Sequence, residues 1–343
     1  IHHQNTGGNR VFIDNGTLFF NGTGTLNSDA AFDASNGTIT FTAAGTLKLA
    51  ALNSDLGSSF SPGTGTVEYD LAGDQNIFNT TYNNLEIDGS DLKKVAHSPL
   101  DVDGNLTITN GTLDMTNVGT QNNVIDLEGN FLMNGGVLTA GTSDNHDVVG
   151  DWNDVNGTFQ SGVSAAGTIT LSGVGSNINT AASNNFFNLT INSAGTETAQ
   201  TALDVDGAFT ISGGTFANGS LIHNVAGDWN DVNGTYQAGA AGEGTITLSG
   251  ASSNINTAAS NNFFNLTINS AGTETAQTAL DVDGAFTISG GTFANGSLIH
   301  NVAGDWNDVN GTFTPSGGTI ILSGSGTSVT TAGLNNFYNL TIE

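Results

Sequence analysis

Short runs of alternating apolar and polar residues recur along the chain. Leu203-Asp204-Val205-Asp206 alternates, and so does Phe209-Thr210-Ile211-Ser212. Because successive side chains of a β-strand point to opposite faces, this pattern predicts strands with one buried face. Gly213-Gly214, Asn218-Gly219 and Asn233-Gly234 predict turns, because glycine and asparagine tolerate positive φ. No stretch has the i, i+3, i+4, i+7 spacing of an amphipathic helix.

The alternating runs belong to a long internal repeat. The segment from Ser176 to Thr235 recurs without a change from Ser253 to Thr312, a shift of 77 residues. The motif GDWNDVNGT begins at Gly150, Gly227 and Gly304, on the same period. Repeats of this kind predict one supersecondary unit that is stacked many times.

A finer step of mostly 20 to 25 residues runs inside each repeat. Motifs of the V-x-G type are followed two residues later by an apolar residue, at Leu106, Phe131, Trp152, Phe209 and Trp229. We therefore expect an all-β fold, a parallel β-helix (β-solenoid) with about 20 residues per coil, roughly 17 coils and about four coils per 77-residue superrepeat. One continuous solenoid would fill residues 1–343, with divergent coils in 1–149, repeat units in 150–226 and 227–303, and a partial unit in 304–343. The competing fold, one small β-sandwich per repeat, would need linkers that the sequence does not contain.

The amino-acid composition excludes some classes of binding partner. The chain has 4 Lys+Arg against 31 Asp+Glu, a formal net charge of -27, and no Cys. Such a chain cannot neutralise phosphate groups, so nucleic acid and anionic membrane surfaces are not expected as partners. No apolar run is long enough for a transmembrane helix, and no signal peptide is visible, so the sequence looks like a mature or trimmed piece.

Paired aspartates are the first candidates for binding chemistry. Residues i and i+2 of a strand face the same way, so both carboxylates of a D-x-D pair project together, and oxygen ligands suit Ca²⁺. The weak calcium candidates are Asp101, Asp103, Asp204, Asp206, Asp281 and Asp283. No D-x-D-x-D-G loop supports a dedicated site, so a solvated polar face with general cation screening is the favoured interpretation. No cofactor is expected, apart from calcium at these weak candidate positions.

Tryptophans beside aspartates allow a second candidate site. Trp152, Trp229 and Trp306 lie between the pairs Asp151/Asp154, Asp228/Asp231 and Asp305/Asp308, which could form an aromatic platform for carbohydrate. The Trp positions are equivalent to Phe positions in neighbouring coils, which favours a place in the core.

No catalytic or cofactor-binding residue is expected. Acidic pairs could act as acid and base in a glycoside-cleaving enzyme, but they recur with each repeat, whereas an active site should occur once. The six histidines form no cluster and are expected in turns or on the surface: His2, His3, His97, His146, His223 and His300.

Several stretches carry a resemblance to a known group. These are FSPGTGTVEY from Phe60, YNNLEI from Tyr82, GDWNDVNGTFTPSGGTIILSG from Gly304 and NNFYNLTI from Asn335. They resemble the strand repeats of large bacterial surface proteins, adhesins and extracellular filament proteins. The resemblance implies an extracellular or cell-surface location and an adhesive or filament-forming role, and it supplies no ligand.

We therefore expect a structural extracellular protein and not an enzyme: a subunit of a surface filament or sheath, or the stalk of a fibrous adhesin. Neither end of the sequence shows a polar cap, and an uncapped solenoid end invites another chain, so copies are expected to associate end to end. The alternative is a binding module for surface glycans or one that depends on calcium. A polysaccharide-cleaving β-helix enzyme is the third hypothesis.

Overall fold

The computed structural model describes residues 2–3, 11–116, 123–141, 145–161, 167–239, 244–333 and 335–343. All the regular structure in these residues is β-strand. The chain divides into two compact units, Ile1–Gly167 and Thr168–Glu343. No helix among the described residues is long and apolar enough to span a membrane.

The first unit consists of strands joined by turns, most of them short and two of them ten residues long. They are β1 (His2–His3), β2 (Val11–Phe20), β3 (Thr25–Ser28), β4 (Phe32–Phe41), β5 (Thr46–Leu49), β6 (Ser59–Ser61), β7 (Thr66–Tyr69), β8 (Gln75–Ile77), β9 (Asn84–Ile87), β10 (Leu92–Val95), β11 (Leu100–Val102), β12 (Leu106–Ile108), β13 (Thr112–Asp114), β14 (Ile125–Leu127), β15 (Phe131–Met133), β16 (Val137–Thr139), β17 (Asn145–Val148), β18 (Trp152–Asn153) and β19 (Thr158–Gln160).

The second unit, whose longest strands exceed those of the first unit, is also built of strands joined by turns. They are β20 (Thr168–Leu171), β21 (Asn177–Asn179), β22 (Asn188–Ala199), β23 (Asp204–Val205), β24 (Phe209–Ala217), β25 (Ile222–Val225), β26 (Trp229–Asn230), β27 (Thr235–Gln237), β28 (Thr245–Leu248), β29 (Ser252–Asn256), β30 (Asn265–Ala276), β31 (Asp281–Val282), β32 (Phe286–Ala294), β33 (Ile299–Val302), β34 (Trp306–Asp308), β35 (Thr312–Thr314), β36 (Thr319–Leu322), β37 (Val329–Thr331) and β38 (Asn339–Ile342).

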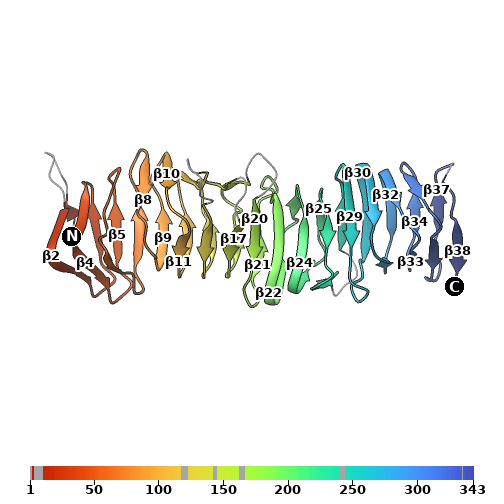
Figure 1. The fold of residues 1–343 in the computed structure, drawn as a ribbon, viewed down its shortest axis with the longest axis horizontal. Helices are drawn as coiled ribbons and strands as arrows, with labels where there is room; N and C mark the ends of the chain where they lie inside the picture. Colours follow the sequence, from red (N-terminus) through yellow and green to blue (C-terminus); the bar gives the residue numbers. More distant parts are fainter. Residues whose placement is uncertain are drawn as a thin grey trace. The chain divides into compact units, whose positions relative to one another are not determined.

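Strands pair in parallel with the strand one coil further along the chain. In the first unit β9 pairs with β7 and with β12, and in the second unit β24 pairs with β22 and with β26. Figure 1 shows these strands lying side by side as successive arrows. The fold is a β-solenoid with coils of about 20 residues and about 16 turns. The predicted fold class is confirmed, and the alternative of separate β-sandwiches is wrong because sandwiches are built from antiparallel sheets.

Apolar side chains line up in columns inside each unit. One column in the first unit runs, in register, through Leu47, Val67, Leu85, Leu106, Phe131 and Trp152, all of them buried. In the second unit the rings of Phe209 and Trp229 stack with centroids 5.0 Å apart. Since burying one large apolar side chain contributes about 1.5–3 kcal/mol, the columns are the main source of stability.

The 77-residue repeat does not match a whole number of coils. In the second unit Leu189 is followed in register, one coil apart, by Phe209, Trp229, Ile255 and Ala276. Leu266 is the repeat copy of Leu189, yet it falls between Ile255 and Ala276 along the chain. One repeat therefore spans more than three coils and fewer than the predicted four, and identical segments lie in different columns.

One predicted turn is instead a bend inside a strand. Gly213 and Gly214 lie within β24, where the pairing with β22 shifts register. Gly214 has φ +70, and a Cβ there would lie 2.2 Å from Ser193 Oγ. Glycine is therefore required for the strand to turn this corner without a break in pairing.

Asparagine side chains link consecutive coils at the start of a strand. In the first unit Asn105 N donates to Asn84 Oδ1 at 3.0 Å, and Asn130 N donates to Asn105 Oδ1 at 3.0 Å. In the second unit Ala208 N donates to Asn188 Oδ1, and Ala285 N donates to Asn265 Oδ1. Each Oδ1 atom therefore accepts a hydrogen bond from a backbone N–H at a point where the pairing between strands is interrupted.

Replacing one of these asparagines tests their contribution. Asn105→Ala should lower the free energy of unfolding by about 1 kcal/mol, because the backbone N–H of Asn130 loses its acceptor. Asn134→Ala is the control, since this exposed side chain makes no hydrogen bond within the described residues; it should change stability by less than about 0.5 kcal/mol. Urea unfolding followed by circular dichroism measures both, and equal effects would contradict the assignment.

Candidate functional site

The aspartate pairs of the second unit bond to asparagines of adjacent coils. Asp204 is in register with Asn224, whose Nδ2 donates to Asp204 Oδ1 at 2.7 Å. The repeat copy is the same: Asn301 Nδ2 donates to Asp281 Oδ1 at 2.9 Å. These two carboxylates therefore have protein partners in the structure.

The second aspartate of each pair is more exposed. Asp206 accepts long hydrogen bonds of 3.4 Å from Asn185 Nδ2, and Asp283 accepts the same from Asn262 Nδ2. Both side chains lie on the outer face beside their partners. The valine between the two aspartates, Val205 or Val282, is buried.

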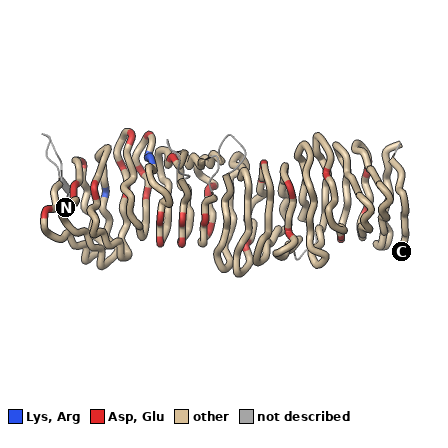
Figure 2. Tube along the Cα trace, viewed as in Figure 1, with Lys and Arg blue, Asp and Glu red and all other residues tan. Residues whose placement is uncertain are grey.

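In the first unit the aspartates form a column of like charge. Asp101 is in register with Asp126, and Asp126 with Asp147. Burial raises the pKa of Asp126, and the charges of Asp101, Asp147 and Asp103 raise it further. Figure 2 shows acidic positions on successive coils of this unit. The sequence does not reveal Asp126 and Asp147 as partners of Asp101, because neither belongs to a D-x-D pair and they become neighbours only through the register of successive coils.

No compact metal centre is formed by these side chains. Among the described residues, no group of three His, Cys, Asp or Glu side chains converges as a metal-binding set. Neighbouring strands lie about 4.8 Å apart, so the column spreads its carboxylates along the stack.

The tryptophans lie in the core. The sequence predicts this position, because phenylalanines occupy the equivalent positions in neighbouring coils. Trp152, Trp229 and Trp306 are each 1% exposed. Each is in register with a phenylalanine of the preceding coil: Phe131, Phe209 and Phe286. The aromatic platform for carbohydrate is therefore wrong in its proposed form.

One aspartate beside each tryptophan is also buried. Asp231 is fully buried, and its Oδ2 accepts a 3.0 Å hydrogen bond from Trp229 Nε1 while its Oδ1 accepts one of 2.9 Å from Ala258 N. Burial raises the pKa of the Asp231 carboxyl, although these hydrogen bonds favour the charged form. The carboxylate thus accepts hydrogen bonds from the indole and from a backbone N–H inside the protein, and it does not lie beside a surface site.

Tryptophan fluorescence tests the burial. We expect blue-shifted native emission that resists quenching by acrylamide, because all three indoles are inside the columns. Unfolding in guanidinium should shift the emission to the red and make it quenchable. Native emission that is quenched as strongly as unfolded emission would contradict the burial of these rings.

Three histidines lie in the interior, so their expected place in turns or on the surface is wrong. His146, His223 and His300 are at most 2% exposed. His97 is half-buried, and the side chains of His2 and His3 lie outside the described residues. The signal that could have found them is the alternation in IHNV, where His occupies an inward position.

Each buried histidine accepts a hydrogen bond from the backbone of the preceding coil. His223 Nδ1 accepts from Leu203 N at 3.0 Å, and His300 Nδ1 accepts from Leu280 N at 2.9 Å. With Nδ1 an acceptor, the proton of neutral His223 is on Nε2, which donates to Asn218 O at 3.2 Å. Burial lowers the pKa of His146, His223 and His300 to about 4.

These histidines predict a loss of stability in acid. The unfolded chain binds the proton at the ordinary pKa of 6.5, whereas the folded chain binds it only near 4. The stability that neutral His223 contributes is therefore complete above pH 6.5 and is lost as the pH falls toward 4, by about 3 kcal/mol. The buried carboxyl of Asp231, whose pKa is raised, acts in the opposite sense, because it favours the folded state at low pH.

His223→Asn isolates the histidine contribution. The amide keeps an acceptor near the Nδ1 position but does not titrate. The variant should be less stable than wild type at pH 7.5 and should lose less stability between pH 6.5 and pH 4.5. Urea unfolding at a series of pH values measures this difference, and parallel pH profiles for the two proteins would refute the assignment.

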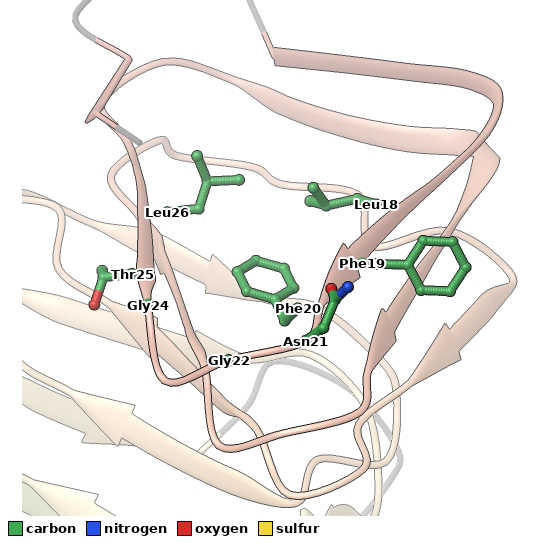
Figure 3. Close-up of a pocket in the computed structure, with 8 residues that line it drawn as sticks. All are labelled: Leu18, Phe19, Phe20, Asn21, Gly22, Gly24, Thr25 and Leu26. Carbon is green, nitrogen blue, oxygen red and sulfur yellow. The ribbon is translucent and has the colours of Figure 1, made fainter.

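A hollow with apolar side chains lies at β2 and β3 of the first unit, next to β1, which pairs with β3. Leu18, Phe20 and Leu26 line this hollow of about 280 Å³. Figure 3 shows these three side chains facing one another, while Phe19 points away. Phe20 stacks on Phe41 of the next coil with centroids 4.2 Å apart. This surface is the end of an aromatic column of the first unit.

A comparable surface lies on the last coil. Strand β38 pairs with β36, and its residues Leu340 and Ile342 are 40% and 74% exposed. The same four residues, NLTI, begin β22 and β30, where they pair on both edges and the Leu and Ile are buried. Within the described residues β38 thus has one paired edge, and its core side chains are uncovered.

Comparison with protein-family models, with curated proteins and with solved structures gives no match to this chain.

Proposed function

We propose that the chain is a structural extracellular protein: a subunit of a surface filament or sheath, or the stalk of a fibrous adhesin, whose coils stack end to end on those of another copy. The observation that carries the proposal is the stacking itself: each coil pairs in parallel and in register with the next. The NLTI sequence of β38 also begins β22 and β30, where a further parallel coil covers it. A strand with this sequence can therefore pair with a coil of another copy.

The hollow of the first unit supports the same role. Buried Phe20 and half-buried Leu18 and Leu26 line it, and they are apolar residues of the kind that fill the interior columns. The two edges of a parallel strand differ, so contact between copies would be head to tail, a mode that builds open filaments when the rotation between copies does not close a ring. The resemblance of the repeats to those of bacterial surface proteins agrees with this role. The proposal assigns no catalytic residue.

A second candidate is an adhesin module that depends on calcium. It rests on the register of Asp101, Asp126 and Asp147, which brings like charges together on successive coils. A divalent cation would relieve this repulsion. Asp103 would add a further oxygen ligand on the same face.

Electron microscopy of the purified chain tests both candidates. Wild type should form fibres, and Leu340→Asp/Ile342→Asp should abolish them, because charged side chains oppose burial of the edge. Ile299→Asp is the matched control, since Ile299 is 58% exposed on β33, a strand paired on both edges; fibres should persist. Fibres that survive the double substitution would refute assembly through β38, and single particles in wild type would refute self-association.

A chelator separates the second candidate from the first. If the acidic column binds calcium in a way that assembly or adhesion needs, EDTA should disperse wild-type fibres and added Ca²⁺ should restore them. Fibres that are unchanged by EDTA would contradict the role of calcium.

A further inference from the structure

A polar hollow of about 420 Å³ lies on the outer face of the second unit. Its side chains come from four successive coils, and three of them are in register: Thr210 with Asn230, and Asn230 with Asn256. Gln277 follows Ala276, which is in register with Ile255, so it extends the same row. We call this hollow the amide groove; its polar side chains are Thr210, Asp228, Asn230, Asn254, Asn256 and Gln277.

One wall of the amide groove is held in place by its own hydrogen bonds. Asp228 Oδ1 accepts from Asn254 N at 2.7 Å and from Asn254 Nδ2 at 3.2 Å. Gln277 Nε2 donates to Asn254 Oδ1 at 2.8 Å. The three side chains therefore have fixed orientations before any ligand arrives, which lowers the entropic cost of binding.

Other polar groups in the groove are free to bind. The side chains of Thr210 and Asn256 make no hydrogen bond within the described residues. A hydroxyl and a carboxamide each offer both donors and acceptors. Their strands pair through β26, so they are two coils apart, about 10 Å, on one face.

The lining excludes three classes of ligand. Its exposed side chains are polar, so an apolar molecule would gain little by entering. Asp228 would repel an anion, and the second unit contains no Lys or Arg to attract one. The groove has a single carboxylate, one of whose oxygens already accepts two hydrogen bonds, and this is too few charged ligands for a dedicated calcium site.

A neutral molecule with many hydroxyl groups fits what remains. Amides, a hydroxyl and one oriented carboxylate can donate hydrogen bonds to such a molecule and accept them from it, and a neutral ligand is not repelled by the charge of Asp228. We propose that the amide groove binds a neutral saccharide unit. The site is independent of end-to-end association, because none of its residues belongs to β2, β3 or β38, so the two proposals can fail separately.

The following repeat supplies a natural comparison. There Ser328 N donates to Asp305 Oδ1 at 2.7 Å, as Asn254 N does to Asp228. Thr330, in register with Asn307, takes the place of Asn256. The backbone arrangement is thus kept while the free carboxamide is lost, which makes Thr330→Ala a matched control for Asn256→Ala.

Saturation-transfer difference NMR on the whole chain tests the proposal. The probes are methyl β-glucoside, methyl α-mannoside, methyl β-galactoside and diacetylchitobiose, with glucuronate as the anionic probe. At least one neutral glycoside should receive saturation and glucuronate should not. Asn256→Ala should weaken the affinity for that glycoside roughly three- to tenfold, because it removes one bonding group, and Thr330→Ala should leave it unchanged.

Two further results complete the test. Thr210→Val, which keeps the shape of the side chain and removes its hydroxyl, should weaken the same glycoside, and circular dichroism should show each variant folded. Absence of transfer from all four neutral probes would overturn the proposal. So would an affinity that is unchanged in both Asn256→Ala and Thr210→Val, or that falls equally in Thr330→Ala.

Discussion

Parallel, in-register pairing of each coil with the next is the interaction on which the other features depend. A single coil has no second layer to cover its apolar residues, so its stability must come from its neighbours. Register then determines the interior: Phe209 lies on Trp229 because their strands pair residue for residue. A displacement by one residue would turn the aromatic rings outward, which makes the register strongly specified.

Most of the buried polar groups among the described residues are held by the same stacking, whereas buried Glu68 of the first unit pairs with Lys48. The second unit contains no Lys or Arg, so a buried carboxyl such as that of Asp231 is stabilised by the indole and backbone N–H groups. His223 likewise has a backbone N–H from the coil before it and a carbonyl from a nearby turn. In the first unit the buried Lys93 donates to the carbonyls of Leu71, Gly73 and Ser90. Asp231, His223 and Lys93 are thus held mainly by backbone N–H and C=O groups of turns and adjacent coils.

The fold could be predicted from the sequence because its signal repeats. Leu106, Phe131 and Trp152 occupy one slot at successive steps, and the structure places them in one column. The position of His223 could not be predicted in the same way, because its partner is the N–H of Leu203, a group that every residue but proline possesses. The amide groove depends on register between coils of unequal length, 20 residues from Thr210 to Asn230 and 26 from Asn230 to Asn256, which composition and period do not give. The column through Asp126 was missed because it is formed by single residues one coil apart and has no motif.

The mismatch between the repeat and the coil has a genetic consequence. Identical copies in a gene recombine unequally, so whole repeats are gained or lost in one event. Each such event in the second unit would preserve every local contact, because the coil that follows a given segment is unchanged in sequence. A repeat is not a whole number of coils. Adding or removing one would therefore also rotate all later coils of the second unit about the axis of its stack by a fraction of a turn. Copy number would therefore set the direction in which the last coil faces, as well as the length of the stack.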